Sequence, residues 1–363
     1  MPPFAEFLAE RAAVAWILLR RLTLRKMWLL GVSWASLILR RSRSGKIPPI
    51  LIIKITSRCN FSCVMCPKTS LSLDFYKNPV DMDFLRLQRL LTDNAGSICL
   101  VQLHGGEPLY HKDIGRIIDL LDRLNLTYTV TTNGYLLTRE ISLKLMRNCL
   151  RLILSIDAAD PVLYGHIRRG GDLDILRDNI LQLQRLKKKF RSPRPIIKVV
   201  MAVFKYNLAD LTNMVRFCRA HEIRELIFQE GVLYDNPGLG PEDTLKTHAE
   251  LALEMSGRAK ALAKNLGVKL RIDFPGLKSS RGSFGTSCFY LYFTILFQQN
   301  FMATYCFGSY DHLLPYLGPD LAGFWNGPQS RFVEARWNLR RNFIPKICQD
   351  AYVTGVNCVL KNT

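Results

Sequence analysis

From residue 50 onward, short apolar runs alternate with longer amphipathic segments. The apolar runs have the length of strands, and the segments between them repeat their apolar residues at helical spacing. Strands are predicted over 50–56, 98–103, 126–131, 150–156, 196–204 and 225–229, and helices over 83–92, 113–125, 138–148, 173–189 and 208–221. Strands this uniformly apolar are buried on both faces, as in a parallel sheet covered by helices. Because six βα units are fewer than the eight of a closed barrel, the predicted fold is α/β, a partial (βα)6 TIM-like barrel over residues 47–274.

The regular alternation ends after residue 229. Residues 233–243 are rich in Gly, Pro and Asp, which predicts a loop that covers the mouth of the barrel. A helix over 244–266 and a short strand over 268–272 follow, and then a linker over 275–283. We therefore expect a small C-terminal domain over 284–363. Its apolar run at 289–297, the turn at 298–300 and the second run toward Cys306 predict a hairpin.

Residues 1–46 form a basic, amphipathic helical appendage in this prediction. They contain nine Lys or Arg against two Glu, and the uncharged stretch 27–39 includes Trp28 and Trp34. That stretch is shorter than the roughly 20 residues needed to span a bilayer. A signal peptide is not expected, because no basic segment precedes the apolar run. Two alternatives stay open: a helix lying in a membrane interface, or a helical hairpin packed on the barrel or on a partner.

Composition narrows the class of protein. A chain of 363 residues with 48% hydrophobic positions has enough material for a substantial core. The net charge of +20 favours anionic partners. A specific nucleic-acid partner is not expected, because single-strand binders interleave aromatic and basic residues and the basic cluster at 185–194 contains only Phe190. Ten cysteines are too sparse for a secreted disulfide scaffold, and their clustering indicates a reducing, cytoplasmic location.

Three of these cysteines, Cys59, Cys63 and Cys66, directly follow the first predicted strand. Thiolates are soft ligands that bind zinc or iron–sulfur clusters. A zinc site normally has a fourth ligand nearby, often from a second CxxC pair, and none follows here. Three thiolates on a four-iron cluster leave one iron open to another ligand. The strand end is also where barrels of this kind place their active sites.

Polar or glycine residues stand at the other strand ends as well. Adjacent glycines let the backbone approach a ligand closely, and a carboxylate accepts hydrogen bonds from an ammonium group. The alternative for each position is a simple strand-ending turn. The candidates are Gly105, Gly106 and Glu107 after the second strand, Asn133 after the third, Ser155 and Asp157 at the fourth, and Gln229 at the sixth.

The cysteine triplet and the Gly-Gly-Glu-Pro stretch about forty residues later together resemble the radical S-adenosylmethionine (radical SAM) enzymes. The resemblance implies a [4Fe-4S] cluster on Cys59, Cys63 and Cys66 that binds SAM at its open iron. It implies that the turn ending at Glu107 holds the methionyl amino group, that Ser155 contacts the ribose, and that Arg168 pairs with the methionine carboxylate, with Arg169 nearly as suitable. Asn133, Asp157 and Gln229 are expected at the same rim.

The same resemblance implies the reaction. One electron, delivered by a donor such as flavodoxin or ferredoxin, cleaves SAM to methionine and a 5′-deoxyadenosyl radical. The radical then abstracts hydrogen from a substrate. The sequence assigns no further catalytic residue.

The C-terminal segment resembles the SPASM or twitch extensions of these enzymes, which bind auxiliary iron–sulfur clusters. Four cysteines are too few for two such clusters, so one auxiliary [4Fe-4S] cluster is expected; the alternative is a domain that has lost its cluster and buries free thiols. The candidate ligands are Cys288, Cys306, Cys348 and Cys358. The remaining cysteines, Cys99, Cys149 and Cys218, are predicted to be core residues.

The substrate class is left open. A peptide in natural-product or protein maturation is the first expectation, although residues 1–46 are too short and apolar for a winged peptide-binding domain. The alternative is a lipid-linked, sugar or other anionic small molecule, modified at the inner face of the membrane. A zinc-binding structural module is the alternative that is not an enzyme.

Overall fold

A computed structural model describes residues 23–70, 78–277, 292–304, 314–316, 318, 320–327 and 330–340. Within these residues one sheet runs in the order β10-β9-β8-β1-β2-β3-β4-β5-β6-β7. Every neighbouring pair from β8 and β1 through to β7 is parallel, while β9 is antiparallel to both β8 and β10. The strands are β1 Ile50–Thr56, β2 Leu100–Gly105, β3 Tyr128–Thr132, β4 Cys149–Ser155, β5 Ile196–Val203, β6 Glu225–Glu230, β7 Lys269–Asp273, β8 Thr294–Phe297, β9 Met302–Thr304 and β10 Leu314–Pro315.

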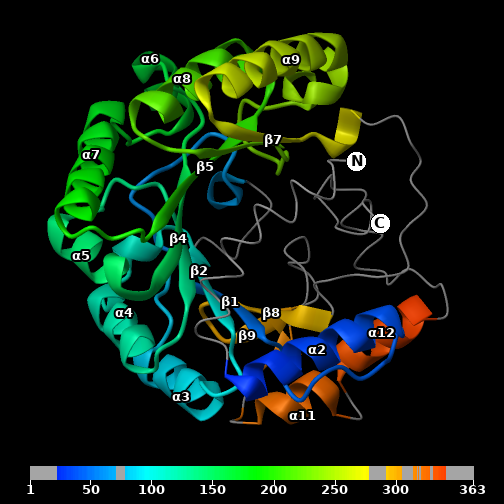
Figure 1. Cartoon of the computed structure of the whole chain (residues 1–363). Coiled ribbons are helices and arrows are strands. Elements are labelled where there is room, and N and C mark those ends of the chain that lie inside the picture. The colour runs from blue at the N-terminus through cyan, green and yellow to red at the C-terminus, as the bar shows by residue number, and fades with distance from the viewer. Residues whose placement is uncertain are drawn as a thin grey trace.

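The helices lie along the outer side of the curved sheet, which forms an open arc (Figure 1). The α-helices are α2 Leu24–Ile38, α3 Phe84–Asn94, α4 Ile114–Arg123, α5 Arg139–Asn148, α6 Pro161–Ile167, α7 Leu173–Lys189, α8 Leu211–Ala220, α9 Ala249–Leu266, α11 Leu321–Asn326 and α12 Arg331–Arg340. Short 3-10 turns cover Pro67–Thr69, Pro108–Tyr110, Lys205–Asp210, Pro241–Asp243, Leu245–His248 and Pro275–Leu277. Among the described helices, none has the length and hydropathy needed to cross a membrane.

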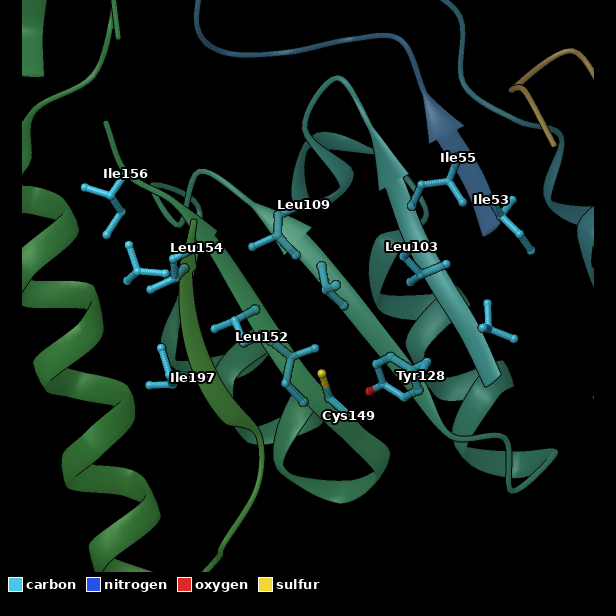
Figure 2. Close-up of a cluster of buried hydrophobic side chains, with 14 of the residues drawn as sticks. Ile53, Ile55, Leu103, Leu109, Tyr128, Cys149, Leu152, Leu154, Ile156 and Ile197 are labelled. Atoms are coloured by element: carbon cyan, nitrogen blue, oxygen red, sulfur yellow. The ribbon is translucent and has the colours of Figure 1, made fainter. Parts of the chain in front are cut away.

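The core lies between the sheet and these helices. Alternate residues of the central strands, among them Ile53, Leu103, Leu152 and Leu154, are fully buried and pack together in Figure 2. Each such side chain contributes about 1.5–3 kcal/mol by leaving water. The opposite face of each strand points into the barrel, where the chemistry-bearing residues are found.

The predicted partial barrel is confirmed: the sheet that the described residues form is mostly parallel and is not closed among them. The predicted short strand at 268–272 is β7, which pairs with β6 and extends the barrel by one strand. α6 was not predicted. The hairpin is confirmed as β8 and β9, closed by a hydrogen bond from Gln298 N to Met302 O at 2.7 Å. Since β8 pairs with β1, this part of the C-terminal segment joins the barrel sheet; the domain limits at 274 and 284 stay predictions.

Candidate cofactor site at the strand ends

The loop after β1 carries Cys59, Cys63 and Cys66 and is held in shape by its own residues. The Oγ1 of Thr69 donates to the carbonyl oxygens of Cys63 and Cys66, at 3.0 and 2.8 Å. The Nζ of Lys68 donates to the carbonyl oxygen of Cys59 at 3.1 Å, so the loop curls around the lysine. Backbone N–H groups point at two of the sulfurs, which stabilises thiolate charge there.

The three thiols lie close enough to influence one another. The pKa of Cys59 is raised to about 11 and that of Cys63 to about 12, mainly by burial and to a smaller extent by the charges of the neighbouring thiolates. Burial also raises the pKa of Cys66. Metal binding to this loop must therefore release the thiol protons.

The donor set is compatible with an iron–sulfur cluster, whose usual protein ligands are thiolates. Within the described residues, no three Cys, His, Asp or Glu side chains gather around one metal position. Cluster ligation by thiolates does not need such a point, because each thiolate binds a different iron of the cluster.

The turn after β2 lies directly against the chain that leads into Cys59. Gly106 N donates to Thr56 O, and Glu107 N donates to Arg58 O, both at 2.8 Å. A Cβ on Gly106 would stand 2.2 Å from Arg58 O, and one on Gly105, whose φ is 149°, would stand 2.3 Å from Thr56 O. Only glycine fits at these two positions.

Glu107 is buried at the centre of this arrangement. Its Oε1 accepts hydrogen bonds from Leu109 N at 2.9 Å and from Thr132 Oγ1 at 2.6 Å, and its Oε2 accepts one from Asn133 N at 2.7 Å. Burial raises the pKa of Glu107, while these three hydrogen bonds lower it in part. The carboxylate is thereby fixed in one orientation between β2 and β3.

Asn133 connects the third strand end to the cysteine loop. Its Nδ2 donates to the Oδ1 of Asn60 at 2.9 Å, and Asn60 directly follows Cys59. The Nδ2 of Asn60 is buried and has no hydrogen-bond partner among the described residues. This orphaned donor beside the thiols is the kind of group that a bound cofactor satisfies.

Asp157 and Arg168 form a buried ion pair beside the same loop. Asp157 follows β4; its Oδ2 accepts from Arg168 Nε at 2.5 Å and its Oδ1 from Ala202 N at 2.8 Å. The Nη1 of Arg168 lies 3.9 Å from Cys63 Sγ. Burial lowers the pKa of Arg168, but Asp157 and Cys63 raise it more, so the net pKa lies above its ordinary value. The guanidinium stays charged next to a thiol.

The chain around Arg168 also supports the cysteine loop through its backbone. Val64 N donates to Ile167 O at 3.0 Å, and Ser62 N donates to Arg169 O at 2.9 Å. The structure thus brings Arg168 and Asp157 together with the three cysteines.

Ser155 and Gln229 stand at the carboxyl ends of β4 and β6, both partly buried. Ser155 is in register with Val200 of β5, and Gln229 with Ala202 of the same strand. They therefore lie on the same edge of the sheet as the cysteine loop.

Several residues that hold the site were not singled out from the sequence. Asn236 donates from its Nδ2 to Cys66 O at 2.7 Å and to Thr69 Oγ1 at 2.9 Å. It belongs to the loop that was predicted to cover the barrel mouth, which was the only signal for it. Lys68 and Thr132 also hold the site. Lys68 donates to a backbone carbonyl and Thr132 to the buried Glu107 carboxylate, and neither contact produces a spacing pattern in the sequence.

Lys54 is a second cation that the sequence analysis missed. It is buried on β1, in register with His104 of β2. Its charge lowers the pKa of Cys66 and that of His104, although burial is the larger influence on both. His104 titrates at about 4 for these two reasons, burial first.

The four C-terminal candidates, Cys288, Cys306, Cys348 and Cys358, lie outside the described residues. The auxiliary cluster stays a prediction. Cys99, Cys149 and Cys218 are buried in the core, as predicted.

Comparison with protein-family models matches residues 53–218 to the radical SAM superfamily. Among curated proteins, a probable GTP 3',8-cyclase of Methanocaldococcus jannaschii is 30% identical over 183 residues, which cover 49% of this chain and 58% of that protein. The GTP 3',8-cyclase of Limosilactobacillus fermentum is 27% identical, over 47% of this chain and 51% of that protein. The chain thus spans about half the length of these relatives.

Solved structures share the fold at low sequence identity. Streptococcus suis SuiB bound to S-adenosylmethionine superimposes with a TM-score of 0.60 at 14% identity, covering 82% of this chain and 67% of that one. The anSMEcpe structure with bound AdoMet has a TM-score of 0.59 at 17% identity, covering 82% and 84%. These structures confirm the predicted partial-barrel fold, and the family match over residues 53–218 is in accord with the predicted resemblance to radical SAM enzymes.

Proposed function

We propose that this chain, whose residues 53–218 match the radical SAM superfamily, binds a [4Fe-4S] cluster and SAM and abstracts hydrogen from a substrate. One observation carries the proposal. The three-cysteine loop and the chain leading into it are hydrogen-bonded to the Gly105–Glu107 turn and, through Asn60, to Asn133, which supports a role for the cysteines as metal ligands beside an amino-group site at the turn.

Each part of this unit has a task in cofactor binding. The thiolates of Cys59, Cys63 and Cys66 hold the cluster. Glu107 accepts hydrogen bonds from the methionyl ammonium group, in an orientation set by the three donors to its carboxylate. The two glycines before it let this turn pack against the chain that leads into Cys59, since a Cβ at either would collide with Thr56 O or Arg58 O.

Arg168 and Ser155 complete the proposed SAM site. Asp157 holds the Nε edge of the guanidinium, which leaves Arg168 positively charged beside Cys63 and suited to pair with the methionine carboxylate. Ser155 lies on the same sheet edge for contact with the ribose. When bound, the cluster and SAM would supply the radical chemistry, while Asn236 holds the backbone of the loop at Cys66.

The test is anaerobic reconstitution followed by iron, sulfide and SAM-cleavage measurements. The native chain is expected to bind about four irons if the barrel cluster is alone, and about eight with an auxiliary cluster. The triple variant Cys59→Ala/Cys63→Ala/Cys66→Ala should lose the barrel cluster and reductive cleavage. The matched control, Cys149→Ala/Cys218→Ala, removes two buried core thiols and should keep both. Zinc without sulfide in the native chain, or cleavage by the triple variant, would overturn the proposal.

For the substrate, we propose a peptide first. Support comes from fold neighbours whose structures contain peptides: SuiB with precursor peptide SuiA, and anSMEcpe with the Cp18Cys peptide. A ferredoxin or flavodoxin as electron donor and a cytoplasmic location remain part of this proposal.

A specific observation favours a second candidate, an anionic small molecule. Lys54 is buried below the cysteine loop and its charge reaches Cys66, and the curated relatives act on GTP, a polyanion. GTP titration of the loaded enzyme, with Lys54→Met and the distant Lys187→Met compared, separates the two. If GTP binds tightly and Lys54→Met weakens the binding while Lys187→Met does not, the result supports an anionic small-molecule substrate. If GTP does not bind, the peptide proposal stands.

A further inference from the structure

Helix α2 packs with a face of mixed polar and apolar residues inward and exposes most of its large apolar residues. The residues it buries are Lys26, Leu29, Ser33, Ser36 and Leu37. In a soluble helix the apolar stripe faces the core, whereas α2 buries two serines and a lysine beside its two leucines and leaves tryptophan exposed. The large apolar side chains that it and its C-cap expose are Leu24, Met27, Trp28, Trp34, Ile38 and Leu39.

The exposure of this stripe is large. Leu24 is 82% exposed, Trp28 64% and Ile38 72%, at positions that share one face of the helix. Contiguous apolar surface of this kind marks a contact with a membrane or a partner.

The helix is fixed to the barrel, so its outer face is presented in a defined orientation. The carbonyl oxygen of Lys26 accepts from Cys99 Sγ at 4.0 Å, just before β2, and the Trp34 ring packs edge-on against Phe293, just before β8. The segment after α2 is tied down as well, by Asn326 Nδ2 donating to Ser44 O at 3.0 Å.

The charged residues along this part of the sequence are all basic. No Asp or Glu occurs between Glu10 and Asp74, while Arg25 lies in α2 and Arg40, Arg41 and Arg43 follow it. Arg25, Arg41 and Arg43 are exposed and Arg40 partly so. Tryptophan, aliphatic side chains and arginine are the composition that binds a headgroup–acyl interface, and juxtamembrane arginines attract anionic lipids.

We propose that the outward face of α2 docks on an anionic lipid bilayer, with the apolar stripe in the interface and the arginines on the headgroups. A second copy of the chain is a poorer occupant, because it would bring like-charged arginines together. The inference does not depend on the proposed function.

The position of α2 sets which way the cofactor site faces. Its contacts with Cys99 and Phe293 lie at the amino ends of β2 and β8, whereas the cysteine loop lies at the carboxyl end of β1. A seven-residue strand separates these ends by about 23 Å. Docking through α2 therefore tethers the enzyme and leaves the cofactor site facing away from the lipid.

The test is flotation of the full chain with vesicles of phosphatidylcholine alone and of phosphatidylcholine with about one third phosphatidylglycerol. The native chain should float with the anionic vesicles. Trp28→Glu/Ile38→Glu should weaken binding about 100-fold by removing the apolar contact. Arg40→Gln/Arg41→Gln should weaken it roughly thirty-fold on anionic vesicles only. The matched control, Leu251→Glu/Leu253→Glu, changes the charge equally on exposed positions of α9 and should bind normally.

Far-UV circular dichroism and light scattering accompany each variant, so that misfolding or self-association is visible. If the native chain does not float, the stripe is covered by residues 1–22, a second copy or a protein partner, and the proposal is wrong. If Trp28→Glu/Ile38→Glu binds the vesicles as well as the α9 control does, and salt abolishes the binding of both variants, the net charge alone causes adsorption. The proposal is then equally wrong.

Discussion

The buried pair of Asp157 and Arg168 allows the sharpest test of how the site is held. Arg168→Met keeps the length of the side chain and removes its charge. The Asp157 carboxylate, which is fully buried, then keeps only the hydrogen bond from Ala202 N at 2.8 Å. A buried carboxylate without its counter-ion is costly, because water cannot solvate it.

The expected cost follows from that geometry. Removing one partner of a buried ion pair destabilises a protein by about 3–5 kcal/mol. Asp157→Asn leaves the Arg168 guanidinium without its counter-ion; since that side chain is 13% exposed, some of the loss is recovered from water. The double variant Asp157→Asn/Arg168→Met removes both charges, and its cost should fall short of the sum of the single costs by about 2 kcal/mol or more.

Urea unfolding of the cofactor-free chain, followed by far-UV circular dichroism under reducing conditions, measures all three free energies. The control is Arg258→Met, whose ion pair with Glu254 on α9 is exposed on both sides and is worth less than about 1 kcal/mol. The reasoning would be refuted if the double variant lost as much unfolding free energy as the two single variants together. It would also be refuted if Arg168→Met lost no more than the Arg258→Met control. SAM affinity is measured separately, since the double variant should regain stability without regaining the proposed carboxylate contact.

Three further outcomes are expected. Gly106→Ala, whose Cβ would stand 2.2 Å from Arg58 O, should abolish SAM binding, measured by equilibrium dialysis. Glu107→Gln should cost about 1–3 kcal/mol in urea unfolding and weaken SAM binding, because an amide nitrogen would face Asn133 N. His104 titrates at about 4 in the folded chain against 6.5 unfolded, so the unfolded state binds more protons between these values; stability should fall by about 3 kcal/mol as pH drops from 6.5 to 4, and His104→Gln should flatten that profile.

The sequence predicted the strands well where both faces are buried, because a short uninterrupted apolar run between turns is typical of a buried strand. It placed the second strand at 98–103, whereas β2 is Leu100–Gly105. The polar residues His104 and Gly105 look like a turn, yet they pair with Lys54 and Thr56 of β1. Pairing across the sheet extends the strand beyond its apolar run, and no local pattern reports it.

For the site, the parallel arrangement of strands was enough to predict that Glu107 and Asn133 lie near the cysteines. Which atoms each side chain uses was not predictable. Asp157 was expected at the cofactor rim, but its two oxygens accept from Arg168 and from Ala202 N. It acts on the proposed cofactor through the arginine it positions, and only the three-dimensional partners distinguish that role from direct contact.

Helix α2 shows the same limit in a different form. The uncharged stretch with Trp28 and Trp34 left two alternatives, packing on the barrel and lying in a membrane interface. In the structure the helix packs through Ser33, Ser36 and Leu37, and so has its bulky apolar residues left over on the outside. Packing and the proposed docking therefore use largely opposite faces of one helix and do not compete. A hydrophobicity pattern cannot reveal this, because it gives the period of a stripe but not which side of the helix the barrel takes.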